Sequence, residues 1–234
     1  MKVFMGYARD SLRLAPRIRR ARSASKMRIA PKMGGMTFLV VLASGCSSLL
    51  HSNAAPDQTY LLRAAPAPAT AATPGAPSLR IGRTLTAPGL DADRIVLVRS
   101  DHRMDYYASS RWAAPIPQML EDMAAETMRT SGAWSSVHDS QGAFPTDYFL
   151  QIDIRRFEAD YTEGADPKVH VVLNCTLGRR TDRELLTSFV AEGSAAADAN
   201  RLSSVVAAFE SATQAALASI AEHGKQALSA AESK

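Results

Sequence analysis

A boundary at Cys46 divides this chain into a processing segment and a segment that is left to form the fold. The residues directly before it, Ala43 to Gly45, are small, and an apolar run over 38–42 precedes them. Arg28 and Lys32 place positive charge ahead of that run, which completes the pattern of a secretory signal. A cysteine directly after the small residues is typical of a lipobox, in which the thiol is joined to diacylglycerol. We therefore expect Cys46 to be lipidated and to become the first residue of the mature chain.

The apolar run is too short to span a bilayer permanently, because a spanning helix needs about 20 apolar residues. A cleaved signal is therefore favoured over an anchor helix, and also over a short buried strand that carries a cysteine by chance. Residues 1–26 are basic and fit a signal poorly, so the true start is expected at Met27, and 1–45 are assigned to an extension plus signal. A twin-arginine signal at Arg19 and Arg20 is the alternative, although no apolar stretch follows it closely.

The basic charge of the chain lies almost wholly in that processing segment. The formal net charge is +4, but residues 1–45 hold ten of the 27 basic residues and one of the 23 acidic residues. The remainder carries 17 basic and 22 acidic residues, which is a net charge of −5. Nucleic-acid binding needs a basic surface on the folded domain, so this class of function is disfavoured.

After the boundary, we expect a lipidated tether over 46–57, a domain over 58–226 and a disordered tail over 227–234. A flexible Ala/Pro-rich loop is expected over 64–77, because such a composition buries too little apolar surface to order itself.

Alternating and helical hydrophobic patterns predict the elements of the domain. Strands are expected over 60–62, 79–81, 94–98, 104–107, 148–154, 169–177 and 184–191, with a bulge at 155–156 that returns Phe157 to the core face. Helices are expected over 115–130 and about 201–222, with Asn200 as N-cap and Gly224 as a stop signal. The elements do not alternate as βαβα, so we expect an α+β fold in which two helices pack on a mostly antiparallel sheet.

No catalytic or metal-binding motif stands out. The five histidines are scattered, and none pairs with another histidine or a cysteine at the spacing of metal ligands. Asp153 and Asp160 have opposite parity in a strand, which makes them a weak carboxylate pair. Cys175 shares a face with Val171 and Leu173 and is expected to be a small buried hydrophobe. We therefore predict no enzyme activity and no cofactor.

Arg111 and Trp112 precede the first helix and have two interpretations. A Trp/Arg pair on a surface is typical of a binding hot spot for a partner. The favoured interpretation is that Trp112 packs in the core against the sheet, because tryptophan is highly buried on average. Arg111 is then only its neighbour in the chain.

At these residues the chain resembles the ABC-type transport auxiliary lipoproteins, the PqiC-like group. The resemblance rests on the order of several short motifs over about 46–224. They are the lipobox Cys46, Tyr60-x-Leu62, Ile95-Val96, Tyr107-x-x-x-Arg111-Trp112-Ala113-x-Pro115, Asp147-Tyr-x-Leu-Gln-Ile-Asp-Ile-x-x-Phe157 and Val205-Val-Ala-Ala-Phe-Glu210. The chain departs from the family pattern at Ala43, where lipoboxes usually carry Leu, and in the Ala/Pro insertion over 64–77.

The resemblance implies a lipoprotein that is anchored in the outer membrane and faces the periplasm. It would work with an MCE-domain protein and with the permease and ATPase of an ABC transporter that moves phospholipid or other hydrophobic molecules. Such a member is not itself an ATPase and could assemble as a homo-oligomer. The alternative function is a lipoprotein that binds lipid itself or helps to assemble lipopolysaccharide or outer-membrane proteins.

The lipidation of Cys46 can be tested on the native protein by intact-mass measurement. We expect a mature chain that begins at Cys46 and carries the added mass of diacylglycerol, because the signal is cleaved directly before that residue. A mature N-terminus anywhere before Cys46 would contradict the assignment.

Overall fold

Three long strands form one side of the sheet in this computed structural model, which describes residues 56–68 and 70–233. β7 (Tyr148–Asp160), β8 (Lys168–Arg179) and β9 (Leu185–Ala196) pair antiparallel in chain order. This meander confirms the strands that the alternating patterns predict in the second half of the chain. The described residues belong to one compact unit over 54–234. The signal, Met27 and Cys46 lie outside them.

A bulge in β7 keeps its apolar side chains on one face. The register of β7 against β8 shifts between Ile154 and Arg156, as predicted. Before the shift Ile152 and Ile154 are fully buried, and after it Phe157 and Ala159 are. One extra residue in a strand reverses the parity of everything that follows, so the bulge restores the core face.

The expectation of a mostly antiparallel sheet is wrong, because the sheet is mixed. Its short strands are β1 (Gln58–Tyr60), β2 (Ser78–Ile81), β3 (Leu85–Thr86), β4 (Arg94–Val98), β5 (Met104–Trp112) and β6 (Ser136–His138). β2, β3 and β4 each run parallel to β7, β1 runs parallel to β5, and β6 runs parallel to β2. Only β4 and β5 form a further antiparallel pair. Parallel neighbours require a crossover, and the connections from β2 and from β4 to β7 both include the first helix.

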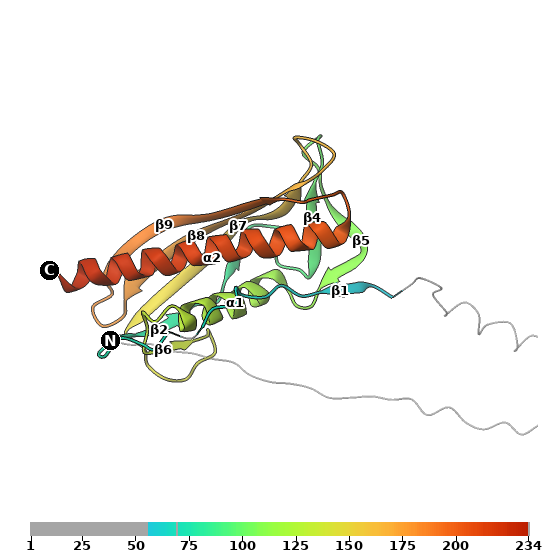
Figure 1. The fold of residues 1–234 in the computed structure, drawn as a ribbon. Coiled ribbons are helices and arrows are strands. Elements are labelled where there is room, and N and C mark those ends of the chain that lie inside the picture. The colour runs from blue at the N-terminus through green and yellow to red at the C-terminus, as the bar shows by residue number, and fades with distance from the viewer. Residues whose placement is uncertain (1–55, 69, 234) are drawn as a thin grey trace, which may run out of the picture. The chain divides into compact units, whose positions relative to one another are not determined.

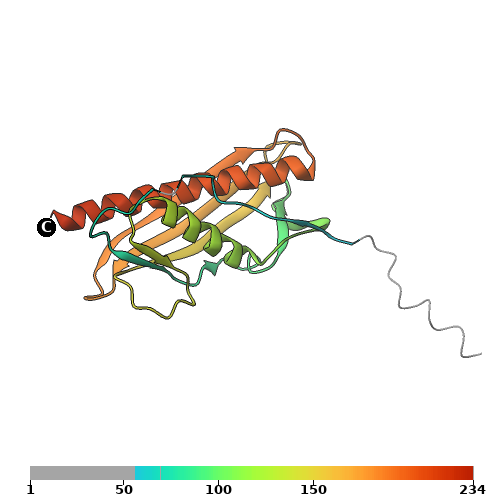
Figure 2. The ribbon, with the colours of Figure 1, turned by 60° about the horizontal axis from the view of Figure 1, so that its bottom comes forward.

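Two helices lie on the same face of this sheet (Figures 1 and 2). α1 (Ile116–Thr130) confirms the predicted helix, and its buried side includes Leu120, Met123 and Met128. α2 (Leu202–Glu232) follows β9 and packs on β8 and β9 and against α1.

Two predictions about the C-terminal part are wrong for the described residues. The second helix does not end near residue 222, and the segment after 227 is not a disordered tail. α2 continues through Gly224 to Glu232. A Cβ at Gly224 would lie 3.6 Å from the Trp134 ring, so this glycine lies in a packed contact rather than at a helix end. Leu228, one turn further on, is buried, and its packing stabilises the last turns of the helix. Asn200 does not cap α2; its side chain accepts a hydrogen bond from the Tyr161 hydroxyl.

The backbone of α2 lies directly on β9 at Gly193. A Cβ at this position would overlap the carbonyl oxygen of Ala212 and lie 2.8 Å from its carbonyl carbon. Ala208, Ala212 and Ala216 are buried along the same stripe of α2. Small side chains on both elements therefore let helix and strand approach closely, and they leave no gap at this contact.

By length and hydropathy alone, Leu202–Ala231 could cross a membrane, and it is the one described helix that could. In the structure 56% of its most apolar 18-residue window is buried within the protein. The apolar stripe is therefore explained by packing on the sheet.

The Ala/Pro-rich segment over 64–77 forms neither helix nor strand among its described residues, and contacts hold both ends of it. The Arg63 carbonyl accepts a hydrogen bond from Gln214 of α2 at 3.0 Å. The Thr73 amide donates to the Gly132 carbonyl at 3.3 Å, just beyond the end of α1.

A carboxylate fastens β2 to the start of β7. Asp147 Oδ2 accepts hydrogen bonds from the Ser78 hydroxyl at 2.6 Å and from the Ser78 amide at 2.8 Å. These two bonds hold the pKa of Asp147 below its usual range.

We expect Gly193→Ala to lower the free energy of unfolding by about 2–3 kcal/mol, because the added methyl group overpacks the α2–β9 contact. Urea unfolding followed by circular dichroism measures this. Gly164→Ala is the matched control, since nothing lies within 4 Å of its Cβ. Equal stability of the two variants would show that α2 does not rest on β9 as described.

We expect Asp147→Asn to be less stable than the wild type at pH 7, by no more than about 1 kcal/mol because the site is exposed. A lowered carboxyl pKa stabilises the folded state above the unfolded value of about 3.9, and this contribution is lost as the pH falls through the folded pKa. The gap between variant and wild type should therefore close below that pH. Unfolding curves from pH 2 to 7 measure the gap, with Asp166→Asn as an exposed control. A gap that is constant over this range would contradict the role of the charge.

Candidate functional site

The two residues singled out before α1 are separated by the sheet. Trp112 is 1% exposed and meets the rings of Phe157 and Phe209 edge-on, at centroid distances of 6.1 Å and 5.2 Å. Arg111 points to solvent and forms an ion pair with Asp93 at 3.6 Å. The structure therefore places Trp112 in the core, and only Arg111 is accessible to a partner.

Cys175 is a buried thiol among the side chains that face α2. It is 1% exposed, and burial raises the pKa of its thiol to about 12. A reactive cysteine needs a lowered pKa and access to solvent, and Cys175 has neither. Its place confirms the expectation of a small buried hydrophobe.

The bulge in β7 alters the relation between Asp153 and Asp160. It puts both on the face opposite the core, although their parity in the sequence differs. Six strand steps of about 3.3 Å still keep them roughly 20 Å apart. Asp153 pairs with Arg155 at 3.3 Å and Asp160 with Arg156 at 3.1 Å. They are therefore partners in separate ion pairs and not a carboxylate dyad.

A hollow of about 980 Å³ opens between the start of α1, the segment around β3 and the loop after β6. Glu121, Asp122 and Asp139 line it, and burial together with the other two carboxylates raises the pKa of Asp122. No histidine, cysteine or lysine is among the residues that line it. In the described part of the chain, no three His, Cys, Asp or Glu side chains are grouped to hold a metal.

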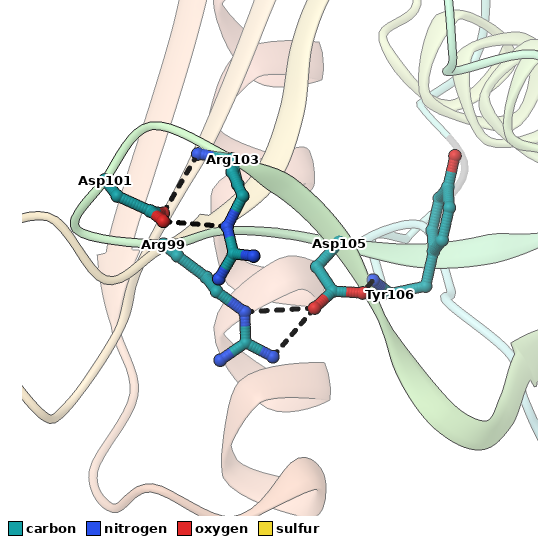
Figure 3. A network of polar contacts seen from close by, with 5 residues as sticks. All are labelled: Arg99, Asp101, Arg103, Asp105 and Tyr106. Atoms are coloured by element: carbon teal, nitrogen blue, oxygen red, sulfur yellow. Dashed lines mark hydrogen bonds and ion pairs between the residues drawn. The ribbon is translucent and has the colours of Figure 1, made fainter.

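The tip of the β4–β5 hairpin carries a network of charges that neutralise one another (Figure 3). Arg99 donates to Asp105 Oδ2 through Nε at 3.0 Å and through a terminal nitrogen at 2.7 Å. Arg103 pairs with Asp101 at 2.7 Å. The hydrogen bond from Arg99, with a second from the Tyr106 amide, lowers the pKa of Asp105. The network stiffens the tip and leaves no net charge there to attract a partner.

At the opposite end of β7, two connections meet beside the fastened Asp147. The loop over 139–147 precedes β7, and the turn over 180–184 joins β8 to β9 (Figure 1). The amide of Arg180 donates to the Asp147 carbonyl at 2.8 Å. Sequence spacing does not reveal this juxtaposition, because residues 144 and 180 lie on different connections. The two connections together form a surface hollow that is lined by Phe144, Arg80 and Arg180.

Structures that share this fold are known. The crystal structure of protein XCC0632 from Xanthomonas campestris is similar to this chain, with a TM-score of 0.67 and 24% sequence identity. The similarity covers 76% of this chain and 100% of that protein's chain. The crystal structure of an uncharacterised protein is similar over 72% of this chain and 99% of its own, with a TM-score of 0.57 and 14% identity. At these identities the likeness shows the fold alone. No protein with a curated description matches the chain.

The family model of the ABC-type transport auxiliary lipoprotein component matches residues 60–221. The match runs from the last residue of β1 into α2, and it therefore covers most of the helix-on-sheet domain. This confirms the resemblance carried by the short motifs, and it indicates membrane anchoring in the cell envelope and association with an ABC transport system. The chain belongs to the ABC-type transport auxiliary lipoprotein component family.

Proposed function

We propose that this protein is a non-enzymatic adaptor, lipidated at Cys46 and held in the outer membrane on its periplasmic side. In this role it joins the outer membrane to an MCE-domain protein and to the permease and ATPase of an ABC-type lipid transport system. The family match supports the transport role. The signal pattern before Cys46 supports the anchor, and Ser47 behind it favours the outer membrane, since an Asp at that place is the usual retention signal of enteric inner-membrane lipoproteins.

The packing of the domain supports an adaptor over a lipid carrier. A carrier needs an apolar cavity that buries most of its ligand. Here α2 rests on β9 at Gly193, and Trp112, Phe157 and Phe209 fill the space between α2 and the sheet. A hollow of about 980 Å³ lies outside this core, beside the start of α1, and its lining mixes carboxylates such as Glu121 with arginines and apolar residues. This closed core is the observation that favours surface docking.

The carrier remains the second candidate, and one measurement separates the two. Native mass spectrometry of the purified lipoprotein should show only the covalently attached lipid if the protein is an adaptor. A stoichiometric, non-covalently bound phospholipid would favour the carrier. The same spectra report whether the protein is a homo-oligomer, as the family resemblance allows.

We expect the native protein, solubilised in mild detergent, to co-purify with an MCE-domain protein and an ABC-type ATPase. Cys46→Ser should abolish the diacylglycerol adduct and the cleavage before residue 46, and it should lower the recovery of outer membrane with the complex. Cys175→Ala is the matched control, because Cys175 is buried and should leave the anchor intact. Label-free mass spectrometry of the eluates measures both effects.

Recovery of neither partner with the wild-type protein would contradict the adaptor function. A Cys46→Ser protein that still carries diacylglycerol, or that still recovers outer membrane with the complex, would contradict the anchor and leave the adaptor to be judged by its partners alone.

A further inference from the structure

A shallow, partly aromatic hollow lies where the loop before β7 meets the β8–β9 turn. It has a volume of about 690 Å³ and is lined by Phe144, Pro145 and Phe149 together with Arg80 and Arg180. Phe144 is 69% exposed, the largest exposed fraction among the large hydrophobic residues described. Its ring lies 6.1 Å from the His138 ring, so it is oriented by the protein. An aromatic ring held open to solvent beside arginines is typical of a binding hot spot.

Both arginines of this hollow lack a counter-charge. Arg80 donates from its terminal nitrogens to the carbonyls of Gly142 and Phe144, which are neutral acceptors. Arg180 donates to the Thr146 hydroxyl at 3.3 Å. Among the described residues, neither guanidinium forms an ion pair. The hollow therefore carries two guanidinium groups that form no ion pair with a described carboxylate.

The neighbouring turn shows that this imbalance is local. Arg179, next to Arg180 in the chain, pairs with Asp182 at 3.0 Å and Glu184 at 3.2 Å. The acids of the turn are thus occupied by Arg179, which leaves Arg180 free toward the hollow. The tip of the β4–β5 hairpin, which lies near the end of β7, is likewise neutral, since Arg99 and Arg103 each pair with an aspartate.

From this charge and shape we infer that the hollow of Arg80, Phe144, Phe149 and Arg180 docks an acidic, apolar segment of a partner protein. The carboxylate of an Asp or Glu would accept hydrogen bonds from the arginines, and a Leu or Phe beside it would pack on Phe144 and Phe149. Charge-assisted bonds from a planar guanidinium to a carboxylate combine strength with fixed geometry. The inference deepens the adaptor function, on which it rests, by naming the surface that the partner contacts.

A protein segment fits this surface better than an anionic membrane does. Arg80 is half-buried and held by the loop carbonyls, so its charge cannot extend far toward a bilayer. Asp139 begins the loop that carries Phe144 and would repel anionic head groups. A bound segment needs only the recess, and it can avoid this carboxylate.

The test uses the full-length lipoprotein in detergent, immobilised and presented with a phage-displayed library of random octapeptides. We expect the selected peptides to combine Asp or Glu with a neighbouring Leu or Phe. Fluorescence anisotropy with one selected peptide should then show binding about tenfold weaker for Arg180→Glu and for Phe144→Ser, since each removes one class of contact. Replacing the acids of the peptide by Lys should abolish binding.

Two variants of similar exposure serve as matched controls. Arg183→Glu changes the same charge three residues away, and Leu185→Ser removes a side chain that is 60% exposed, and neither residue lines the hollow. Both should bind the peptide within about twofold of the wild type, because surface changes away from the contact have small effects. All variants are exposed, so circular dichroism should show unchanged folding.

Several outcomes would overturn the inference. These are selection of no acidic–apolar peptides, equal weakening by Arg183→Glu, binding to phosphatidylglycerol vesicles without peptide binding, or self-association that Arg180→Glu removes. Failure here is separable from failure of the adaptor function. If Arg180→Glu with Phe144→Ser still co-purifies with the MCE-domain protein and ATPase, the adaptor stands and only this docking surface is wrong.

Discussion

The contact between the backbone of α2 and β9 is the constraint on which the rest of this domain depends. Gly193 has no side chain and Ala212 has a small one, so the long helix lies flat on the long strands. That close approach brings Phe209 onto Trp112 and Phe157 and buries the tryptophan that ends β5. With helix and sheet in contact, the interior is filled, and whatever the domain recognises must be met at its surface.

The surface differs in charge from one end of the sheet to the other. At the β4–β5 tip the arginines and aspartates pair among themselves, so the tip is stiff and neutral. At the start of β7, Arg80 and Arg180 have only neutral acceptors, and an exposed Phe144 lines the same hollow. An unpaired guanidinium beside an exposed aromatic ring binds a carboxylate more readily than a neutralised pair does, because no internal ion pair has to break. This contrast is the reason to assign docking to one end.

The domain is also suited to a tethered role. The family match begins at β1, and β1 is a short edge strand that pairs with β5. A tether of 46–57, if extended, reaches about 40 Å at roughly 3.4 Å per residue. An anchor at Cys46 would therefore leave the domain enough reach to meet a partner in the periplasm, while α2 and β9 keep the docking end rigid.

Local patterns in the sequence determined the long elements, because the hydrophobic period of a helix or strand is a property of consecutive residues. The stripe of α1, most of α2, the three long strands and the bulge after Ile154 could all be predicted in this way. So could the burial of Cys175, and the family itself through the order of its motifs. The continuation of α2 past Gly224 could not, because a glycine reads as a stop unless its packing against Trp134 is known.

Only the tertiary structure decided the direction of the short strands and the position of the docking surface. Parallel pairing of β2 and β4 with β7 depends on how the crossover returns the chain, and alternation of side chains is the same in either direction. Arg80 and Arg180 are a hundred residues apart and meet only because β2 and β8 flank β7 on opposite sides. The sequence alone therefore determined what kind of domain this is and where its anchor is expected, while long-range strand pairing, which no local period encodes, decided which charges remain unpaired on its surface.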